Sequence, residues 1–328
     1  MIPPAFWQTG GILASALAPF EVITAAVTAR RVARPGWRVP VPVICVGNAV
    51  VGGSGKTPVV LDFVARLAAR GIAVHCLTRG YGGTARGVTR VELGRHIAAE
   101  VGDEALLLAP AAPTWVGADR AAAARAAVAA GAQVLVMDDG LQNPSLEKTA
   151  SLLVIDGGAG FGNGRLLPAG PLREPVARAA SRCRAAIMIG ADLAGAASSL
   201  PPTLPILQAT LAPGPDMLAH AGRIALAFAG IARPRKFFST LEQAGIVLAE
   251  SRAFADHHSY TARELANLRL RAASLGAPLV TTWKDFVRIP PADRTGITPL
   301  SARIVWARES AVEALLGSFV PEVRDLKI

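Results

Sequence analysis

One run of residues constrains the fold of this chain more than any other feature, namely Gly52-Gly53-Ser54-Gly55-Lys56-Thr57. An apolar run at residues 41–46 precedes it, and a helical pattern follows it directly. Glycines allow successive backbone N–H groups to turn toward one anion, the lysine charge reaches β- and γ-phosphates, and the following hydroxyl suits Mg²⁺. The sequence therefore predicts a strand, a phosphate-binding loop and a helix, which together begin an α/β nucleotide-binding fold.

This loop departs from the commonest spacing. A glycine usually stands five residues before the Gly-Lys pair, and here that position is Val50. Doubled glycines resemble the loops of partition and metal-insertion ATPases, but those loops carry a signature lysine where this chain has Val51. A nucleotide-driven switch protein of that kind remains an alternative, whereas the sequence has no Asn-Lys-x-Asp run that would read guanine. We expect the nucleotide to bind Val50, Val51, Gly52, Gly53, Ser54, Gly55, Lys56 and Thr57.

Composition limits the remaining function classes. The 328 residues suffice for about two domains, and the net charge of +10 favours an anionic partner. Only 5% of residues are aromatic, which is too few for base-stacking platforms, so we expect no nucleic-acid partner. A basic membrane-binding protein for which ATP is structural is a third possible class. The three cysteines are odd in number and lack ligand-like spacing, which argues against both a disulfide framework and a zinc site.

The N-terminal segment is apolar and then basic. Residues 9–29 are almost all apolar or small, and four arginines follow at positions 30, 31, 34 and 38. A secretory signal has the opposite order, and Pro19 and Glu21 interrupt the run that a membrane span requires. We expect residues 1–34 to form a helix that lies in the membrane interface, the alternative being a helix packed on its own domain.

The rest of the chain alternates between strand and helix patterns. Expected strands lie at residues 73–77, 113–116, 133–137, 151–155 and 182–189, with helices between them. A proline-rich stretch at residues 200–215 suggests a domain boundary. We therefore expect an α/β/α sandwich over residues 35–212 and a smaller α/β domain over residues 213–328 that closes the active site.

Several polar residues follow predicted strands, where ligands bind in open α/β sheets. Asp138 and Asp139 end a buried strand, a place where acidic residues hold Mg²⁺ in phosphate-loop enzymes. Arg79 and Tyr81 flank a flexible glycine and are candidate ligand contacts. Asp103 opens a helix, so a capping role competes with a chemical one. His257, beside Asp256 and His258, is a candidate for acid–base chemistry or metal binding.

Six separate motifs, in their order along the chain, resemble the tetraacyldisaccharide 4′-kinases of lipid A biosynthesis. They are Val46-Gly47-Asn48, Thr78-Arg79-Gly80-Tyr81-Gly82, Gly102-Asp103-Glu104, Asp138-Asp139-Gly140-Leu141-Gln142, Pro168-Ala169-Gly170-Pro171-Leu172-Arg173-Glu174 and Phe254-Ala255-Asp256-His257-His258. The resemblance covers essentially the whole chain. It implies a membrane-associated kinase on the cytoplasmic face of the bacterial inner membrane, and we expect this kinase to be a monomer. This kinase would use ATP and Mg²⁺ to phosphorylate the 4′-hydroxyl of a tetraacylated glucosamine disaccharide 1-phosphate, giving the 1,4′-bisphosphate (lipid IVA) and ADP.

The resemblance and the motif chemistry together suggest residue roles. Lys56 holds the β/γ-phosphates, while Thr57, Asp138 and Asp139 hold Mg²⁺, with Glu174 a further metal contact. By resemblance, Asp103 is the general base, oriented by His257 from the second domain. The residues expected to contact substrate or transition-state charge are Arg79, Tyr81, Arg120 and Arg173.

Four positions depart from the family pattern. Leu141 and Asn143 stand where the family commonly has Phe and His, and Ala255 replaces a common Pro. Trp283, in the run Thr281-Thr282-Trp283-Lys284-Asp285, occupies a position that is usually Glu. The nucleotide loop and the acidic residues are intact, so we expect an active enzyme.

Overall fold

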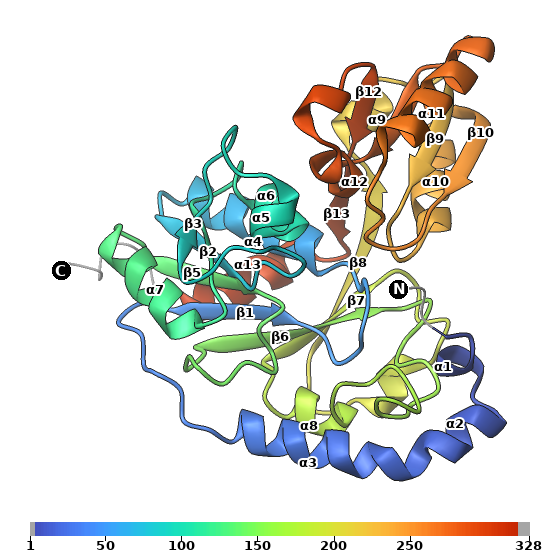
Figure 1. Cartoon of the computed structure of the whole chain (residues 1–328). Helices are drawn as coiled ribbons and strands as arrows, with labels where there is room; N and C mark the ends of the chain where they lie inside the picture. Colours follow the sequence, from blue (N-terminus) through green and yellow to red (C-terminus); the bar gives the residue numbers. More distant parts are fainter. Residues whose placement is uncertain (1–3, 321–328) are drawn as a thin grey trace.

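The computed structural model describes residues 4–320 and contains two sheets (Figure 1). The larger sheet has nine strands in the order β13-β8-β7-β6-β1-β5-β2-β4-β3. Its neighbours pair in parallel, except that β3 and β13 run antiparallel to β4 and β8. The strands are β1 (Val43–Gly47), β2 (Val74–Thr78), β3 (Thr89–Arg90), β4 (Thr114–Val116), β5 (Val134–Asp138), β6 (Ala150–Asp156), β7 (Ala185–Ile189), β8 (Ile206–Pro213) and β13 (Ala302–Trp306).

Helices cover both faces of this sheet. Every residue of β1, β5, β6 and β7 is buried, as expected for parallel strands covered on both sides. Helices α4 (Lys56–Ala69) and α13 (Glu309–Phe319) share one core, and α7 (Arg120–Ala129) packs in another with the opposite face of β1 and β5. Short helices α5 (Ala98–Val101), α6 (Asp103–Leu108) and α8 (Val176–Ala180) complete the layers. The expected α/β/α sandwich is confirmed.

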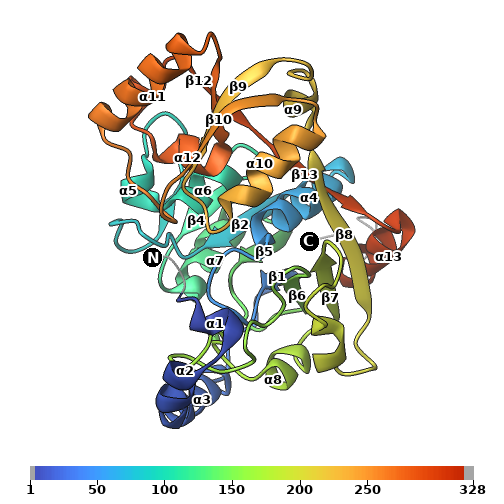
Figure 2. The same cartoon turned by 90° about the vertical axis from the view of Figure 1, so that its right-hand side faces the viewer.

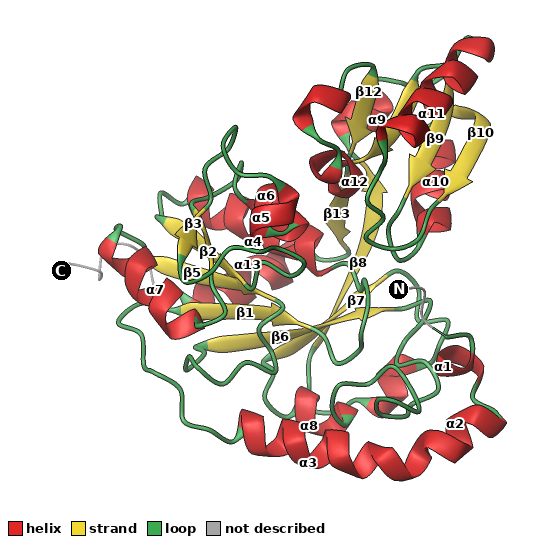
Figure 3. Ribbon diagram, viewed as in Figure 1, coloured by secondary structure: helices red, strands yellow, loops and turns green. Residues whose placement is uncertain are grey.

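The smaller domain has its own parallel sheet in the order β10-β9-β11-β12. Its strands are β9 (Ile224–Ala229), β10 (Val247–Ala253), β11 (Leu279–Thr282) and β12 (Ile297–Leu300). Its helices are α9 (Pro215–Leu218), α10 (Pro234–Gln243), α11 (Ala262–Ser274) and α12 (Trp283–Arg288). Strands β8 and β13 rise from the larger sheet toward this domain (Figure 3).

The structure differs from the expected range of the smaller domain, residues 213–328. Residues 206–213, within the expected boundary stretch, form strand β8, and after β12 the chain returns to the larger sheet as β13 and α13. Most residues of β8 are exposed or half-buried, so the sequence there shows no clear apolar alternation. The smaller domain is therefore an insertion between two neighbouring strands, and residues 321–328 lie outside the described part of the chain.

The N-terminal segment is a broken helix at the end of the molecule opposite the smaller domain (Figures 1 and 2). It comprises α1 (Phe6–Thr9), α2 (Ile12–Leu17), a 3₁₀ turn (Ala18–Phe20) and α3 (Glu21–Val32). Pro19 lies in the turn because it lacks the N–H that a continuous helix needs. Residues Ile12–Val32 have the length and mean hydropathy, 1.7, of a membrane span, and only 11% of that window is buried.

Candidate active site

The phosphate loop connects β1 to α4 with left-handed glycines at its bends. Gly52 has φ 109° and Gly55 has φ 86°, a region that favours glycine. A Cβ atom on Gly55 would also lie 2.6 Å from Ile189 Cδ1. Both the positive φ and the space beside Ile189 therefore favour glycine at this position. The Ser54 hydroxyl is buried with no hydrogen-bond partner among residues 4–320, and a bound phosphate oxygen would supply one.

The first two predicted loop residues anchor the loop to the segment at residues 171–172. Val50 forms a bridge with Leu172, and the Val51 N–H donates to the Pro171 carbonyl at 2.8 Å. That amide is therefore engaged, contrary to the expectation that it binds phosphate. The contacts fix the loop against the segment that carries Arg173.

The acidic pair at the end of β5 lies beside the loop. Thr57 Oγ1 donates to Asp138 Oδ2 at 3.2 Å, and Lys56 Nζ lies 3.6 Å from Asp139 Oδ1. Asp138 Oδ1 is buried and has no partner in the described chain. Burial, together with the charge of Glu104, raises the pKa of Asp138 to about 7. An unsatisfied buried carboxylate oxygen beside a hydroxyl fits a divalent cation.

No group of three His, Cys, Asp or Glu side chains within residues 4–320 is arranged to hold a metal alone. Mg²⁺ does not need one, because it usually binds one or two carboxylates and completes its shell with phosphate oxygens and water. Thr57 and the two aspartates therefore fit Mg²⁺ bound together with nucleotide.

Asp139 also contacts Arg173. The guanidinium Nη1 lies 3.0 Å from both carboxylate oxygens, and the backbone of Asp139 is left-handed with φ 54°. Burial alone would raise the pKa of Asp139, but the charges of Lys56 and Arg173 lower it below its usual value. Arg173, which we expected to contact substrate, is thus held beside Asp139 and near Lys56 of the phosphate loop.

Glu174 does not face this acidic pair. Its buried carboxylate accepts two hydrogen bonds from Arg182 at 2.8 Å and one from Gln142 at 2.9 Å. No hydrogen bond or ion pair joins Glu174 to Thr57, Asp138 or Asp139 within residues 4–320, which differs from the expected metal contact.

A second cluster forms where the two domains meet. Asp103, at the start of α6, is buried, and its Oδ2 lies 3.2 Å from His257 Nδ1 of the smaller domain. Arg288 Nε donates to the same oxygen at 2.7 Å, and Lys284 Nζ lies 3.9 Å away. Burial alone would raise the pKa of Asp103, but the His257 hydrogen bond and the charges of Lys284 and Arg288 hold it well below its usual range. The structure thus brings Asp103 and His257 together from different domains.

Sequence reasoning missed the charged face of α12. Lys284 and Arg288 both point to Asp103, while Asp285 is fully buried and accepts hydrogen bonds from the Gly230 N–H and the Tyr260 hydroxyl, each at 2.9 Å. The available signal was the placement of three charged residues within one helical turn directly after the buried strand β11.

Arg79, Tyr81 and Arg120, the remaining candidates for substrate contact, differ in how far they are exposed. Tyr81 is 65% exposed, and its ring meets the His257 ring edge-on with centroids 5.7 Å apart. Arg79 is exposed as well. Arg120 is only 1% exposed and donates to the Gly117 carbonyl, and burial lowers its pKa to about 10. Arg120 therefore lies beneath the surface that a substrate reaches, unlike Arg79 and Tyr81.

The departures from the family pattern have local structural roles. Leu141 is buried against Gly47, where an added Cβ would lie 2.6 Å from the leucine Cβ. Asn143 Oδ1 accepts hydrogen bonds from the backbone and hydroxyl of Ser145. The Ala255 carbonyl accepts from the His258 N–H in the turn that presents His257. Trp283 is half-exposed and packs edge-on against Phe286.

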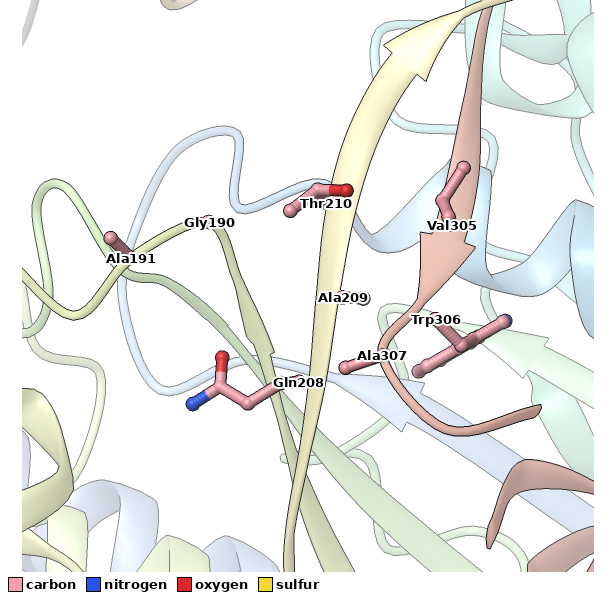
Figure 4. Close-up of a pocket in the computed structure, with 8 residues that line it drawn as sticks. All are labelled: Gly190, Ala191, Gln208, Ala209, Thr210, Val305, Trp306 and Ala307. Carbon is pink, nitrogen blue, oxygen red and sulfur yellow. The ribbon is translucent and has the colours of Figure 1, made fainter. Parts of the chain in front are cut away.

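A cavity of about 210 Å³ lies between the end of β7 and strands β8 and β13 (Figure 4). It is lined by Gly190, Ala191, Gln208, Ala209, Thr210, Val305, Trp306 and Ala307. None of the predicted site residues lines it. Gly190 follows Ile189, which contacts the phosphate loop at Gly55, so this open space lies beside the nucleotide loop.

The fold and site together define the class of this protein as a phosphate-loop kinase. The loop follows β1, an acidic pair lies at the end of β5, and a carboxylate from the larger domain meets a histidine of the smaller one.

Comparisons with known proteins identify the family. The family model for tetraacyldisaccharide-1-P 4′-kinase (LpxK) matches residues 13–320, so the chain belongs to this family. The tetraacyldisaccharide 4′-kinase of Gluconacetobacter diazotrophicus is 57% identical over 98% of each chain, and that of Rhodospirillum centenum is 51% identical over 97% of this chain and 96% of its own. The crystal structure of LpxK from Aquifex aeolicus in complex with ATP has a TM-score of 0.75 and 26% identity, covering 94% of this chain and all of that one.

Membership confirms the activity that the motifs suggested, namely ATP-dependent phosphorylation of the 4′-hydroxyl of the lipid A precursor disaccharide 1-phosphate. The switch-protein and binding-protein alternatives are set aside by the same finding.

Proposed function

We propose that phosphoryl transfer takes place where the two domains meet, with Asp103 as the general base and the phosphate loop as the holder of ATP. One observation carries this assignment: a buried carboxylate and a histidine from different domains lie 3.2 Å apart. A sugar hydroxyl is a poor acid, so a base must accept its proton as the phosphoryl group arrives. Asp103 stays ionised at neutral pH because its cationic neighbours lower its pKa. Such a base contributes about 10²–10⁴-fold to the rate.

On the nucleotide side, we assign Thr57, Asp138 and Asp139 to Mg²⁺. The ion, when bound, neutralises charge on the β- and γ-phosphate oxygens. Lys56 and the amides from Gly52 onward hold those phosphates. Arg173 lies beside Asp139 and supplies further positive charge there. Arg79 and Tyr81, both exposed, are assigned to the acceptor substrate.

We further propose that α2 and α3 hold the monomeric protein on the cytoplasmic face of the inner membrane. Ile12, Leu13, Val22, Ile23 and Val27 are all exposed, which gives this segment an unpartnered apolar surface within the described chain. Arg30 and Arg31 in the last turn of α3, with Arg34 and Arg38 after it, suit anionic headgroups. Because the acceptor carries acyl chains, a protein seated on the bilayer meets its substrate at the surface.

A labelling assay tests the reaction and the base together. The protein is incubated with γ-labelled ATP, Mg²⁺ and tetraacyldisaccharide 1-phosphate in anionic vesicles, and label is measured in lipid and in free phosphate. We expect label in lipid for the native protein and a loss of at least about 10²-fold for Asp103→Asn. Label released only as free phosphate would contradict transfer to the lipid at this site, and an unchanged rate in Asp103→Asn would refute the base.

A further inference from the structure

The guanidinium of Arg288 crosses from the smaller domain to the Asp103 carboxylate of the larger one. Its Nε donates to Asp103 Oδ2 at 2.7 Å, and its Nη2 donates to the same oxygen at 2.5 Å. The Arg288 side chain is only 7% exposed, whereas that of His257 is 35% exposed. Lys284 is 26% exposed, so Arg288 is the most enclosed of the three basic side chains around Asp103.

Arg288 is itself held rigidly. Its Nη1 donates to the Gly230 carbonyl at 2.7 Å and lies 3.2 Å from Asp285 Oδ1. Asp285 in turn accepts from the Gly230 N–H, the Tyr260 hydroxyl and the Thr282 hydroxyl. A guanidinium with its fork engaged on both sides has little freedom to rotate.

The two oxygens of Asp103 differ in how many donors they face. Oδ2 faces Arg288, His257 and the more distant Lys284, whereas Oδ1 accepts a single hydrogen bond in the described chain, from the Glu104 N–H at 2.9 Å. Each carboxylate oxygen has about two lone-pair sites. Both lone-pair sites of Oδ2 are therefore occupied by protein donors, whereas one lone-pair site of Oδ1 has no donor in the described chain.

We propose that Arg288 is a positioning residue that fixes Asp103 by Oδ2, so that Oδ1 receives the proton of the acceptor hydroxyl. This inference rests on the proposed role of Asp103 as base. In the step, the sugar oxygen forms a bond to the γ-phosphorus, the bond from that phosphorus to the bridging oxygen breaks, and ADP keeps the electron pair. The hydroxyl proton moves to Oδ1.

The charges around Asp103 support the same role. Lys284 and Arg288 come from α12, and His257 comes from the loop between β10 and α11. Asp256 Oδ1 lies 4.0 Å from the His257 Nε2. Burial would otherwise raise the pKa of Asp103 and protonate the base. Loss of the nearest fixed cation should both misorient the carboxylate and raise its pKa.

Two variants of Arg288 and one control test the inference. Arg288→Gln should lower kcat about 10²-fold, leave KM for ATP within about twofold, and move the acidic limb of the kcat profile to higher pH. Arg288→Lys, which keeps the charge without the fork, should recover about tenfold of that loss. Arg294→Gln is the matched control, because Arg294 donates to the carbonyls of Ile289 and Val287 and stacks on Phe286 without touching Asp103. It should keep the native kcat and pH profile.

The decisive comparison uses Asp103→Asn as background. Arg288→Gln should then cost no more than about twofold in kcat, because residues that act through one group do not give multiplicative losses. A full multiplicative loss, or a native kcat and pH profile in Arg288→Gln, would overturn the inference. If Arg288→Gln melts below the assay temperature, Arg288→Lys replaces it. Its loss in kcat is then compared between the native protein and the Asp103→Asn background, and a multiplicative loss again overturns the inference. Near-native kcat in Asp103→Asn alone refutes the base assignment, which is a different and separable failure.

Discussion

The Thr28 hydroxyl on helix α3 donates to the backbone carbonyl of Arg173 at 3.1 Å, and the Arg173 side chain reaches Asp139 at 3.0 Å. One residue thus connects the apolar N-terminal helix with the nucleotide side of the site. Thr24 supports the same loop by donating to the Leu167 carbonyl at 2.7 Å, and Glu21 pairs with Arg165. The helix that we assign to the membrane is also a structural support for the loop that ends at Arg173.

This connection predicts a rate effect far from the substrate. Thr28→Val removes one part-buried hydrogen bond worth about 1 kcal/mol, so kcat on vesicle-borne substrate should fall by at most about fivefold. Thr9→Val is the control, since the Thr9 hydroxyl bonds only within its own short helix, to Ala5. Steady-state kinetics on the same vesicles compare the two, and equal rates in both variants would show that the loop holds Arg173 without help from α3.

Membrane attachment should depend on the exposed apolar face. The double variant Ile12→Asp, Ile23→Asp removes two exposed side chains whose burial in lipid is worth about 1.5–3 kcal/mol each, so binding to anionic vesicles should weaken at least tenfold. Leu270→Asp serves as control because Leu270 is also exposed but lies on α11 of the smaller domain. Vesicle cosedimentation is the measurement. Unchanged binding of the double variant would make the segment purely structural.

Lys56→Ala should abolish transfer. Lys56 is buried beside Asp139 and is the one cationic side chain of the loop at residues 50–57. Without it, the charge of the β/γ-phosphates lacks its main neutralising group. ATP binding by calorimetry and label transfer to lipid, measured on the same preparation, separate loss of nucleotide from loss of chemistry. Near-normal turnover would contradict the nucleotide-site assignment.

Asp103 should also make stability depend on pH. Its pKa in the folded protein is below the ordinary value, so its contribution is fully present above about pH 4 and is lost as the pH falls toward the folded pKa. Asp103→Asn removes one of the two carboxylates that pair with Arg288, leaving Asp285 as the other, and should cost about 2 kcal/mol at pH 7. The difference in unfolding free energy between the native protein and Asp103→Asn should therefore be constant above about pH 4 and narrow steadily as the pH falls below it. Urea unfolding at several pH values checks this, and a gap that does not change with pH would contradict it.

Local patterns predicted most of the larger sheet and several of the site's contacts. Buried parallel strands give continuous apolar runs in the sequence, so the placement of Asp138 and Asp139 at the end of β5 could be predicted. The meeting of Asp103 and His257 followed from the family resemblance, and the structure places the two side chains in contact.

The contacts that were not predicted depend on the direction in which a group points and on partners that are far away in the chain. The sequence does not say that the Val51 N–H points at Pro171, that Arg182 engages Glu174, or that Arg120 is buried. Arg288 was missed because its partner Asp103 is far away in the chain, and nothing local distinguishes it from a solvated arginine at a helix end. Strand β13 was missed because its pairing with β8 spans the whole inserted domain.

That insertion has a consequence during synthesis. Strand β13 leaves the ribosome near the end of translation, so until then β8 has a bare outer edge and the face of α4 around Phe63 is uncovered. Trp306 closes this face by stacking on Phe63 with centroids 5.9 Å apart and by donating to Asp62 at 2.9 Å. The nascent chain can thus fold its inserted domain before the nucleotide-binding domain is complete. A chain that stopped before β13 would carry every proposed catalytic group and still present an open sheet edge to its neighbours.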